Sequence, residues 1–296
     1  MNYRNISMLN WNWTRIVAQA VIVVISASHF TGPLIMAAVG DESGEAGPDS
    51  VGVYRTTPQG ELKYHLFRPE KSVNSQGSPA ILFFFGGGWV GGTPGQFFPQ
   101  AEHFSSLGMV AICLEYRVQS RHNTTPFESV SDGLHALAYF QQRATEYGID
   151  PDRIVVSGGS AGGHVAACTA MVADSGLGEG LLPMPAALLL FNPVIDTSAD
   201  GYGMKKIGER WRELSPVHIV HKDVPPVLII HGTQDTTVPF TNAIAFRNRL
   251  RELGGPCTVA AYPGQKHGFF NHGRPSYEST IEESTHFLRS LKLLPE

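Results

Sequence analysis

Charged residues are scarce in this chain, at 16% of 296 residues, and neither sign forms a large patch. The 22 Lys and Arg against 26 Asp and Glu leave a formal net charge of -4. Nucleic-acid binding needs a clustered basic surface that neutralises phosphates, and the sequence has no such cluster. The longest acidic cluster, residues 41–45, lies in a segment with linker composition. We therefore expect no nucleic-acid partner.

Cysteine is almost absent as well, with three residues, Cys113, Cys168 and Cys257. Their spacing matches no metal-binding motif, so we expect no metal site built on thiolates. Cys113 lies in an apolar run and Cys168 in a helical pattern, and we interpret both as small buried hydrophobic residues. A disulfide remains an open alternative.

No apolar run reaches the length of about 20 residues that a membrane span requires. The apolar stretch 16–27 is preceded by arginines and followed by small residues, which is typical of a secretory signal. We predict that residues 1–40 are a signal peptide cleaved near Ala38 or Gly40, that 41–50 are a linker, and that the protein is secreted or periplasmic. A retained N-terminal anchor, and with it a membrane contact, is the alternative interpretation.

The remaining 51–296 are predicted to form one domain, since 42% hydrophobic residues suffice for a large core. Its pattern alternates strands and helices, which favours a mostly parallel central sheet with helices on both faces. The first two strands are expected to pair with each other. Predicted strands are 51–57, 62–68, 80–85, 109–115, 153–157, 186–191, 226–231 and 257–262; predicted helices are 97–107, 127–147, 165–173, 241–253 and 277–294. Residues 196–223 have weak periodicity, and we interpret them as an excursion over the site.

A Gly-x-Ser-x-Gly motif, made by Gly158, Ser160 and Gly162, stands between a predicted strand and a predicted helix. A serine at such a sharp turn has a strained backbone and an exposed hydroxyl, and flanking glycines avoid collisions with the neighbouring elements. The N-terminus of the following helix favours negative charge that develops beside the serine. We predict that Ser160 is a nucleophile; the alternative is a Gly/Ser-rich loop without chemistry.

A serine nucleophile needs a base and a carboxylate that orients the base. Asp235 and His267 each follow a predicted strand and complete the order Ser…Asp…His, so they are the predicted catalytic partners. The alternatives are a turn aspartate and a solvated loop histidine. Asp196 is the reserve acid, and His272 is the rival base. Three further histidines are expected to have other roles: His286 on a helix, His164 in local packing and His231 in structure.

The triple glycine 86–88 after the strand 80–85 allows close backbone approach with N–H groups aimed at one point. We predict an oxyanion hole made by Gly87, Gly88 and Ala161; a plain flexible turn is the alternative. Trp89 and Tyr116 are candidate substrate-binding residues that would line the acyl or alcohol pocket, with a core role as the alternative for each.

Taken together, these motifs resemble the carboxylesterase group of the α/β-hydrolases that includes hormone-sensitive-lipase-like esterases and bacterial acetyl-xylan esterase-like proteins. The resemblance covers about 51–294 and rests on the following matching stretches: Gly86-Gly87-Gly88-Trp89, Glu115-Tyr116-Arg117, Asp150-Pro151-Asp152-Arg153-Ile154, Gly158 to Gly163, Asp235 with Val238-Pro239, and His267-Gly268-Phe269. One position departs from the family, which usually has a histidine before the triple glycine, where this chain has Phe85.

The resemblance implies an α/β-hydrolase fold and a serine esterase that forms an acyl-enzyme on Ser160. It also implies short acyl groups, with acetylated carbohydrate or another small ester as substrate, and no metal or organic cofactor. Two other functions share the fold: a prolyl-oligopeptidase-type serine peptidase and an inactive hydrolase-fold binding protein. The sequence pattern points to no particular oligomeric state.

Overall fold

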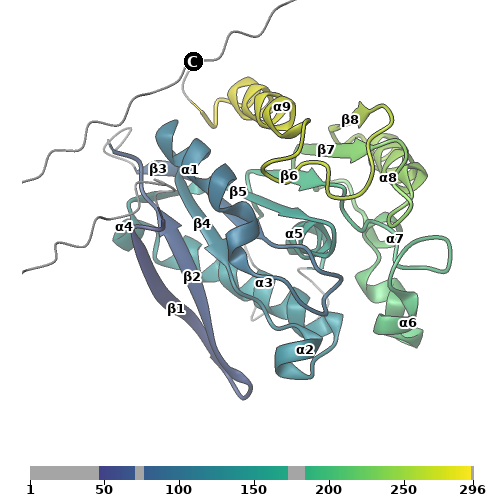
Figure 1. Cartoon of the computed structure of the whole chain (residues 1–296), viewed down its shortest axis with the longest axis horizontal. Coiled ribbons are helices and arrows are strands. Elements are labelled where there is room, and N and C mark those ends of the chain that lie inside the picture. The colour runs from purple at the N-terminus through teal and green to yellow at the C-terminus, as the bar shows by residue number, and fades with distance from the viewer. Residues whose placement is uncertain (1–46, 71–76, 173–183, 295–296) are drawn as a thin grey trace, which may run out of the picture. The chain divides into compact units, whose positions relative to one another are not determined.

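The computed structural model describes residues 47–70, 77–172 and 184–294, in which eight strands form one sheet (Figure 1). The strand order is β1-β2-β4-β3-β5-β6-β7-β8. β1 and β2 are antiparallel to each other, β2 is antiparallel to β4, and all other neighbouring strands are parallel. The strands are β1 (Ser50–Thr57), β2 (Gly60–Phe67), β3 (Ser78–Phe84), β4 (Val110–Leu114), β5 (Ile149–Gly159), β6 (Ala187–Phe191), β7 (Val227–Gly232) and β8 (Cys257–Tyr262).

Both faces of the sheet are covered by helices, which explains the unbroken apolar runs of its central strands. Successive side chains of β3 point to opposite faces, so Leu82 and Phe84 belong to one core cluster and Phe83 to the other. Helices α1 (Phe98–Ser106) and α9 (Tyr277–Ser290) contribute to the second cluster, whereas α3 (Pro126–Gln142), α5 (Ala161–Met171) and α8 (Phe240–Glu252) contribute to the first (Figure 1). The predicted fold class is thus confirmed.

Two helices differ from the sequence-based expectation. The predicted helix 127–147 is two helices, α3 and α4 (Ala144–Tyr147), because Arg143 leaves the helical conformation at φ -107° and ψ 20°. At its start, α3 has a capping box in which Thr125 and Glu128 satisfy each other's exposed N–H groups. The predicted helix 165–173 begins earlier, at Ala161, directly after the serine turn.

The weakly periodic segment 196–223 contains the short helices α6 (Met204–Ile207) and α7 (Pro216–Ile219) with the 3-10 helix η2 (Glu209–Leu214) between them. Two other short helices, η1 (Pro94–Phe97) and α2 (Gln119–His122), lie on loops after β3 and β4. Tyr202 and Lys206 bring the segment over the triple glycine, since Lys206 Nζ donates a hydrogen bond to the carbonyl oxygen of Gly88 at 3.1 Å. The segment therefore approaches the loop after β3, as an excursion over the site would.

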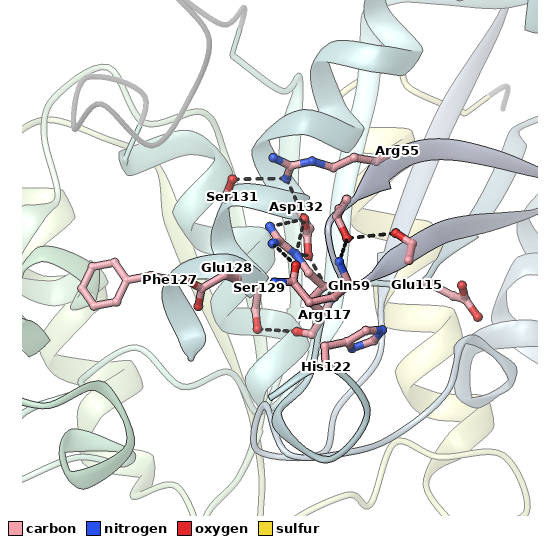
Figure 2. A network of polar contacts seen from close by, with 12 residues as sticks. Arg55, Gln59, Glu115, Arg117, His122, Phe127, Glu128, Ser129, Ser131 and Asp132 are labelled. Atoms are coloured by element: carbon pink, nitrogen blue, oxygen red, sulfur yellow. Dashed lines mark hydrogen bonds and ion pairs between the residues drawn. The ribbon is translucent and has the colours of Figure 1, made fainter. Parts of the chain in front are cut away.

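A buried ion-pair network ties the β1–β2 hairpin to the rest of the sheet (Figure 2). Asp132 on α3 is fully buried and accepts hydrogen bonds from the guanidinium groups of Arg55 in β1 and Arg117 after β4. Its Oδ2 also accepts the backbone N–H of Arg117 at 2.8 Å. One carboxylate thus joins a strand, a loop and a helix.

The predicted signal peptide and the first six linker residues lie outside the described residues. β1 begins at Ser50, where the predicted linker ends. Within the described ranges, no helix combines the length and apolar character needed to cross a membrane. Cys113, Cys168 and Cys257 are all buried and have free thiols. The packing interpretation therefore holds for Cys113 and Cys168, and the disulfide alternative holds for none of the three.

Candidate active site

Ser160 occupies a sharp turn between β5 and α5 with φ 55° and ψ -117°, a conformation that is strained for a residue with a side chain. Backbone hydrogen bonds hold the turn: its N–H donates to Phe191 O at 2.9 Å, and its carbonyl accepts from Val194 N at 3.1 Å. A side chain at Gly162 would collide with the carbonyl oxygens of Phe84 and Phe85. The end of β3 and the start of α5 can therefore come this close only because residue 162 is a glycine.

His267 links the serine hydroxyl to a carboxylate. Its Nε2 lies 2.9 Å from Ser160 Oγ, and its Nδ1 lies 2.7 Å from Asp235 Oδ2. Because an ionised carboxylate only accepts hydrogen bonds, the proton of the neutral imidazole is on Nδ1 and Nε2 is free to accept the serine proton. The structure thus brings the three predicted catalytic residues together, although they lie up to 107 residues apart in the chain.

The Asp235 carboxylate is buried but well supplied with donors. Its Oδ1 accepts the backbone N–H groups of Thr237 and Val238, each at 2.9 Å. Burial acts to raise the pKa of Asp235, but hydrogen bonds from His231, His267 and Val238 outweigh burial and hold that pKa well below its usual range. Asp235 therefore stays ionised at every pH at which the protein is expected to work.

The triple glycine forms a tight loop beside the serine. Gly87, Gly88 and Trp89 have consecutive positive φ values of 129°, 63° and 59°. A Cβ added at Gly86 would lie 3.5 Å from Ser160 Cβ, so the loop and the serine are immediate neighbours. Ala161 is the first residue of α5, and its N–H therefore has no acceptor within the helix. The three predicted oxyanion donors thus belong to two backbone segments next to Ser160, the loop that follows Gly86 and the start of α5.

Phe85, which replaces the family histidine, holds the loop by packing rather than by polar contact. Its ring stacks on Tyr116 with 4.2 Å between ring centroids, and Tyr116 Oη donates to Phe85 O at 2.6 Å. The Arg121 guanidinium lies over the Phe85 ring, 5.9 Å from the ring centroid, and donates to Gly92 O at 2.8 Å. These contacts therefore hold the backbone on both sides of the triple glycine in a chain that lacks the family histidine.

A family model described as the alpha/beta hydrolase fold matches residues 81–271, nearly two thirds of the chain. The chain belongs to the α/β-hydrolase family. A solved structure of esterase 2 from Thermogutta terrifontis is 39% identical to this chain, with a TM-score of 0.78. The match covers 83% of this chain and 96% of the esterase chain. That structure is described as phosphoramylated by tabun, and another, with the same identity and TM-score, as propionate-bound.

Curated relatives point the same way. Probable carboxylic ester hydrolase LipM of Mycobacterium tuberculosis is 28% identical over 80% of the hydrolase, and Esterase LipQ of the same organism is 28% identical over 65%. The chain spans 59% of LipM and 50% of LipQ, about half of their length. The predicted resemblance to hormone-sensitive-lipase-like carboxylesterases is confirmed at the level of the family.

His231, which sequence analysis treats as structural, lies against the candidate active site. It is fully buried at the end of β7, and its Nε2 lies 3.0 Å from Val238 O and 3.4 Å from Asp235 Oδ2. The Nε2–H group therefore donates to Val238 O and lies close to the carboxylate that also orients His267. The sequence signal for this residue is its spacing of four from Asp235 across a tight turn, which by itself does not distinguish contact with the acid from core packing.

The alternative acid and bases lie elsewhere. Asp196 pairs with His218 at 4.0 Å, and the His272 ring packs edge-on against Tyr277 at 5.0 Å. His164 is fully buried with Nε2 2.6 Å from Leu214 O, and burial lowers its pKa to about 4. His286 is exposed on α9. None of these four side chains has a recorded contact with Ser160, Asp235 or His267 among the described residues.

The two candidate substrate-binding residues differ in surroundings. Tyr116 has no exposed surface, so of its two alternatives the structure gives it the core role beneath the loop. Trp89 is 2% exposed and packs between His164 and Tyr202, with ring centroids 4.9 and 5.8 Å away. Together with Gly88 and Lys206 it lines a cavity of about 380 Å³ beside the triple glycine. Only Trp89 is thus placed to line a pocket.

Metal ligation finds no support in the part of the hydrolase that the structure describes, where no group of three or more His, Cys, Asp or Glu side chains converges. Asp235 and His267, the acidic and imidazole groups nearest the serine, are already hydrogen-bonded to each other. The arrangement offers a nucleophile, a base, an orienting acid and backbone donors, which together suit acyl transfer.

Proposed function

We propose that this protein is a serine carboxylesterase that hydrolyses short-chain acyl esters through an acyl-enzyme. The observation that carries the proposal is the hydrogen-bonded series Asp235–His267–Ser160, with distances of 2.7 and 2.9 Å, beside a loop of glycine amides. The names of the relatives, esterases and carboxylic ester hydrolases, support the reaction class.

In the first half of the reaction, His267 Nε2 takes the proton of Ser160 Oγ while the oxygen bonds to the ester carbonyl carbon. The carbonyl oxygen becomes an oxyanion, which the N–H groups of Gly87, Gly88 and Ala161 stabilise. The C–O bond to the alcohol then breaks, and the alcohol leaves with the proton from His267. Asp235 stabilises the imidazolium that exists between these steps.

In the second half, water replaces the alcohol. His267 accepts a proton from the water molecule while the water oxygen attacks the acyl carbon. His267 then returns that proton to Ser160 Oγ when the carboxylic acid product leaves. Every step uses groups of this chain and water, so the reaction needs no metal or organic cofactor.

For the substrate, we propose acyl groups of two to four carbons, with acetylated carbohydrates as the first class to test. The propionate-bound and butyrate-bound structures of the Thermogutta terrifontis esterase, 39% and 38% identical to this chain, support short acyl groups. A panel of p-nitrophenyl esters from acetate to decanoate, with acetylated xylose and glucose, tests this. Higher kcat/KM on long chains than on acetate to butyrate would contradict it.

The role of Ser160 is tested with Ser160→Ala, which should lower kcat by at least about 10³-fold because the nucleophile is lost. Ser290→Ala, an exposed serine on α9, serves as the control and should leave kcat unchanged. A fluorophosphonate should label Ser160 in the native enzyme, as read by peptide mass. Full activity of Ser160→Ala would exclude the mechanism. Absence of fluorophosphonate labelling would favour the binding-protein alternative. A preference for aminoacyl-anilide substrates over esters would favour the peptidase alternative.

We further propose that the protein is exported. The support is the N-terminal pattern alone: arginines, the apolar stretch 16–27 and the small residues up to Gly40. Expression of the full chain in a bacterial host should give a periplasmic or extracellular enzyme whose mass lacks about the first 38–40 residues. A membrane-bound enzyme of full mass would instead indicate a retained anchor.

A further inference from the structure

Two side-chain amides connect the glycine loop to the loop that carries His267. Gln96 Oε1 accepts the backbone N–H of Gly86 at 2.6 Å. Gln96 Nε2 donates to Asn271 Oδ1 at 2.9 Å, and Asn271 Nδ2 donates to the carbonyl oxygen of Gly268 at 2.8 Å. All three hydrogen bonds run in one direction, because each amide offers its oxygen toward Gly86 and its N–H toward Gly268.

The two ends of this amide bridge lie at the reacting groups. Gly86 precedes the two glycines of the predicted oxyanion hole and adjoins Ser160. Gly268 directly follows His267, and its own N–H donates to Asn192 Oδ1 at 3.1 Å. In the sheet, β3 and β8 are separated by three other strands, so no strand pairing relates the loops that follow them. Gln96 and Asn271, 175 residues apart in sequence, supply a direct link.

We propose that Gln96 and Asn271 are positioning residues, which set the distance between the oxyanion donors and the imidazole of His267. The proposal rests on the proposed esterase function, in which the oxyanion and the moving proton belong to one transition state. Displacement of catalytic groups by about 1 Å can cost on the order of 100-fold in rate. Phe85 has no polar side-chain group, and the side-chain acceptor for the Gly86 amide is Gln96 Oε1.

The surroundings of the bridge allow it to be removed without loss of the fold. Gln96 and Asn271 are each half-buried and line a surface cavity of about 430 Å³ together with Glu102 and His272. If either amide is truncated, water from this cavity can satisfy the freed backbone groups. The expected effect of truncation is therefore on geometry and rate rather than on stability.

The first experiment is a double-mutant cycle with Gln96→Ala, Asn271→Ala and the double variant, assayed on p-nitrophenyl butyrate. Each single variant should lower kcat roughly tenfold with KM within about twofold of the native value, and the melting temperature should hardly change. Since either truncation breaks the same bridge, the double variant should be no slower than the slower single variant. Gln142→Ala, an exposed amide at the end of α3, is the matched control and should match the native enzyme.

The proposal would be overturned if the two single-variant losses in kcat multiplied in the double variant. It would also be overturned if the variants had a lower melting temperature but an unchanged kcat. Asn271→Asp adds a further arm: its carboxylate keeps an acceptor for Gln96 but cannot donate to Gly268 O, so kcat should fall at least as far as in Asn271→Ala. Native kcat in Asn271→Asp would contradict the directional bridge.

The second experiment does not depend on catalysis. Hydrogen–deuterium exchange of the Gly86 amide should become about tenfold faster in Asn271→Ala, because Gln96 loses the contact that orients it, although Asn271 itself does not touch Gly86. Unchanged exchange at Gly86 would exclude the bridge even in an active enzyme. If the native protein proves to have no esterase activity, the proposed function fails, while this measurement still decides whether the two loops are coupled.

Discussion

At the scale of single residues, the Asp235 carboxylate depends on donors from two sides. Backbone N–H groups hold Oδ1, while His267 and the buried His231 face Oδ2. His231 Nε2–H also points at Val238 O, 3.0 Å away, and this fixes the turn that carries the aspartate. A residue that takes no proton in the reaction thus contributes to the geometry of the acid.

His231→Ala should lower kcat roughly tenfold with little change in KM, since the acid that orients His267 becomes mobile. The free energy of unfolding should fall by about 1–3 kcal/mol, because buried acceptors on Val238 and Asp235 lose their donor. Steady-state kinetics and urea unfolding measure the two effects. His286→Ala, an exposed histidine, is the control, and native kcat in His231→Ala would exclude a positioning role.

His164 gives a pH dependence of stability. Burial lowers its pKa from the usual 6.5 to about 4, against an opposing hydrogen bond to Leu214 O. Between these two pH values, His164 is mostly protonated in the unfolded chain and mostly neutral in the folded protein. The stability contributed by this site is therefore complete above pH 6.5 and is lost as the pH falls toward 4.

The loss should be on the order of 3 kcal/mol over that window, and urea unfolding at pH 7, 6, 5 and 4.5 measures it. His164→Gln removes the titrating group and should make the free energy of unfolding less dependent on pH there. His286→Gln, which removes an exposed histidine, should keep the native slope. Equal slopes in the native protein and His164→Gln would show that His164 titrates normally in the fold.

At the scale of elements, the approach of α5 to the end of β3 determines where Ser160 stands. Gly162 faces the carbonyl oxygens of Phe84 and Phe85 with no room for a Cβ, and Gly158 faces the Gly162 backbone. The strand that leads into the triple glycine and the helix that begins after the serine therefore share one contact. A shift in this contact moves the nucleophile and the oxyanion donors together.

Gly162→Ala should push α5 away from β3 and reduce both stability and rate. A loss of about 1–3 kcal/mol in the free energy of unfolding is expected from overpacking, with a kcat at least tenfold lower. Gly95→Ala is the matched control, since its added Cβ would have only an ordinary contact with Thr93 at 3.8 Å. A Gly162→Ala enzyme of native stability and rate would contradict this account.

At the scale of the whole molecule, the antiparallel hairpin β1–β2 is joined to the parallel part of the sheet by strand pairing and by the Asp132 network (Figure 2). Asp132 is fully buried, and each of its oxygens accepts more than one donor from Arg55 or Arg117. Removing the charge of Asp132 leaves the buried Arg117 guanidinium and the partly buried Arg55 guanidinium without a counter-charge.

Asp132→Asn should therefore lower the free energy of unfolding by about 3–5 kcal/mol, as measured in urea. The exposed pair Arg210–Glu213 offers the comparison, because Glu213→Gln breaks an ion pair in solvent and should leave stability unchanged within error. Since the network lies on the hairpin side of the sheet, Asp132→Asn should retain native kcat under conditions in which it is folded. Similar stability of the two variants would indicate that the buried network contributes no more than a surface pair.

Sequence patterns alone determined the order of strands and helices, the serine turn and the candidates Ser160, Asp235 and His267, because each of these is encoded by neighbours in the chain. Strand length, apolar periodicity and the Gly-x-Ser-x-Gly spacing are all local signals. The sequence pattern does not predict the break at Arg143 and starts α5 at residue 165 rather than at Ala161, since helix ends depend on packing as well as on propensity.

Tertiary structure decided the rest. The stack of Phe85 on Tyr116 and the bridge between Gln96 and Asn271 join residues that are far apart in the sequence and share no local pattern. The contact of His231 with the acid spans only four residues, but the spacing alone does not distinguish it from core packing. The lateral order of the strands, in which β3 lies between β4 and β5 while β8 lies at the edge, brings these groups to one rim of the sheet. That order follows from the packing of the whole chain, which no single segment encodes.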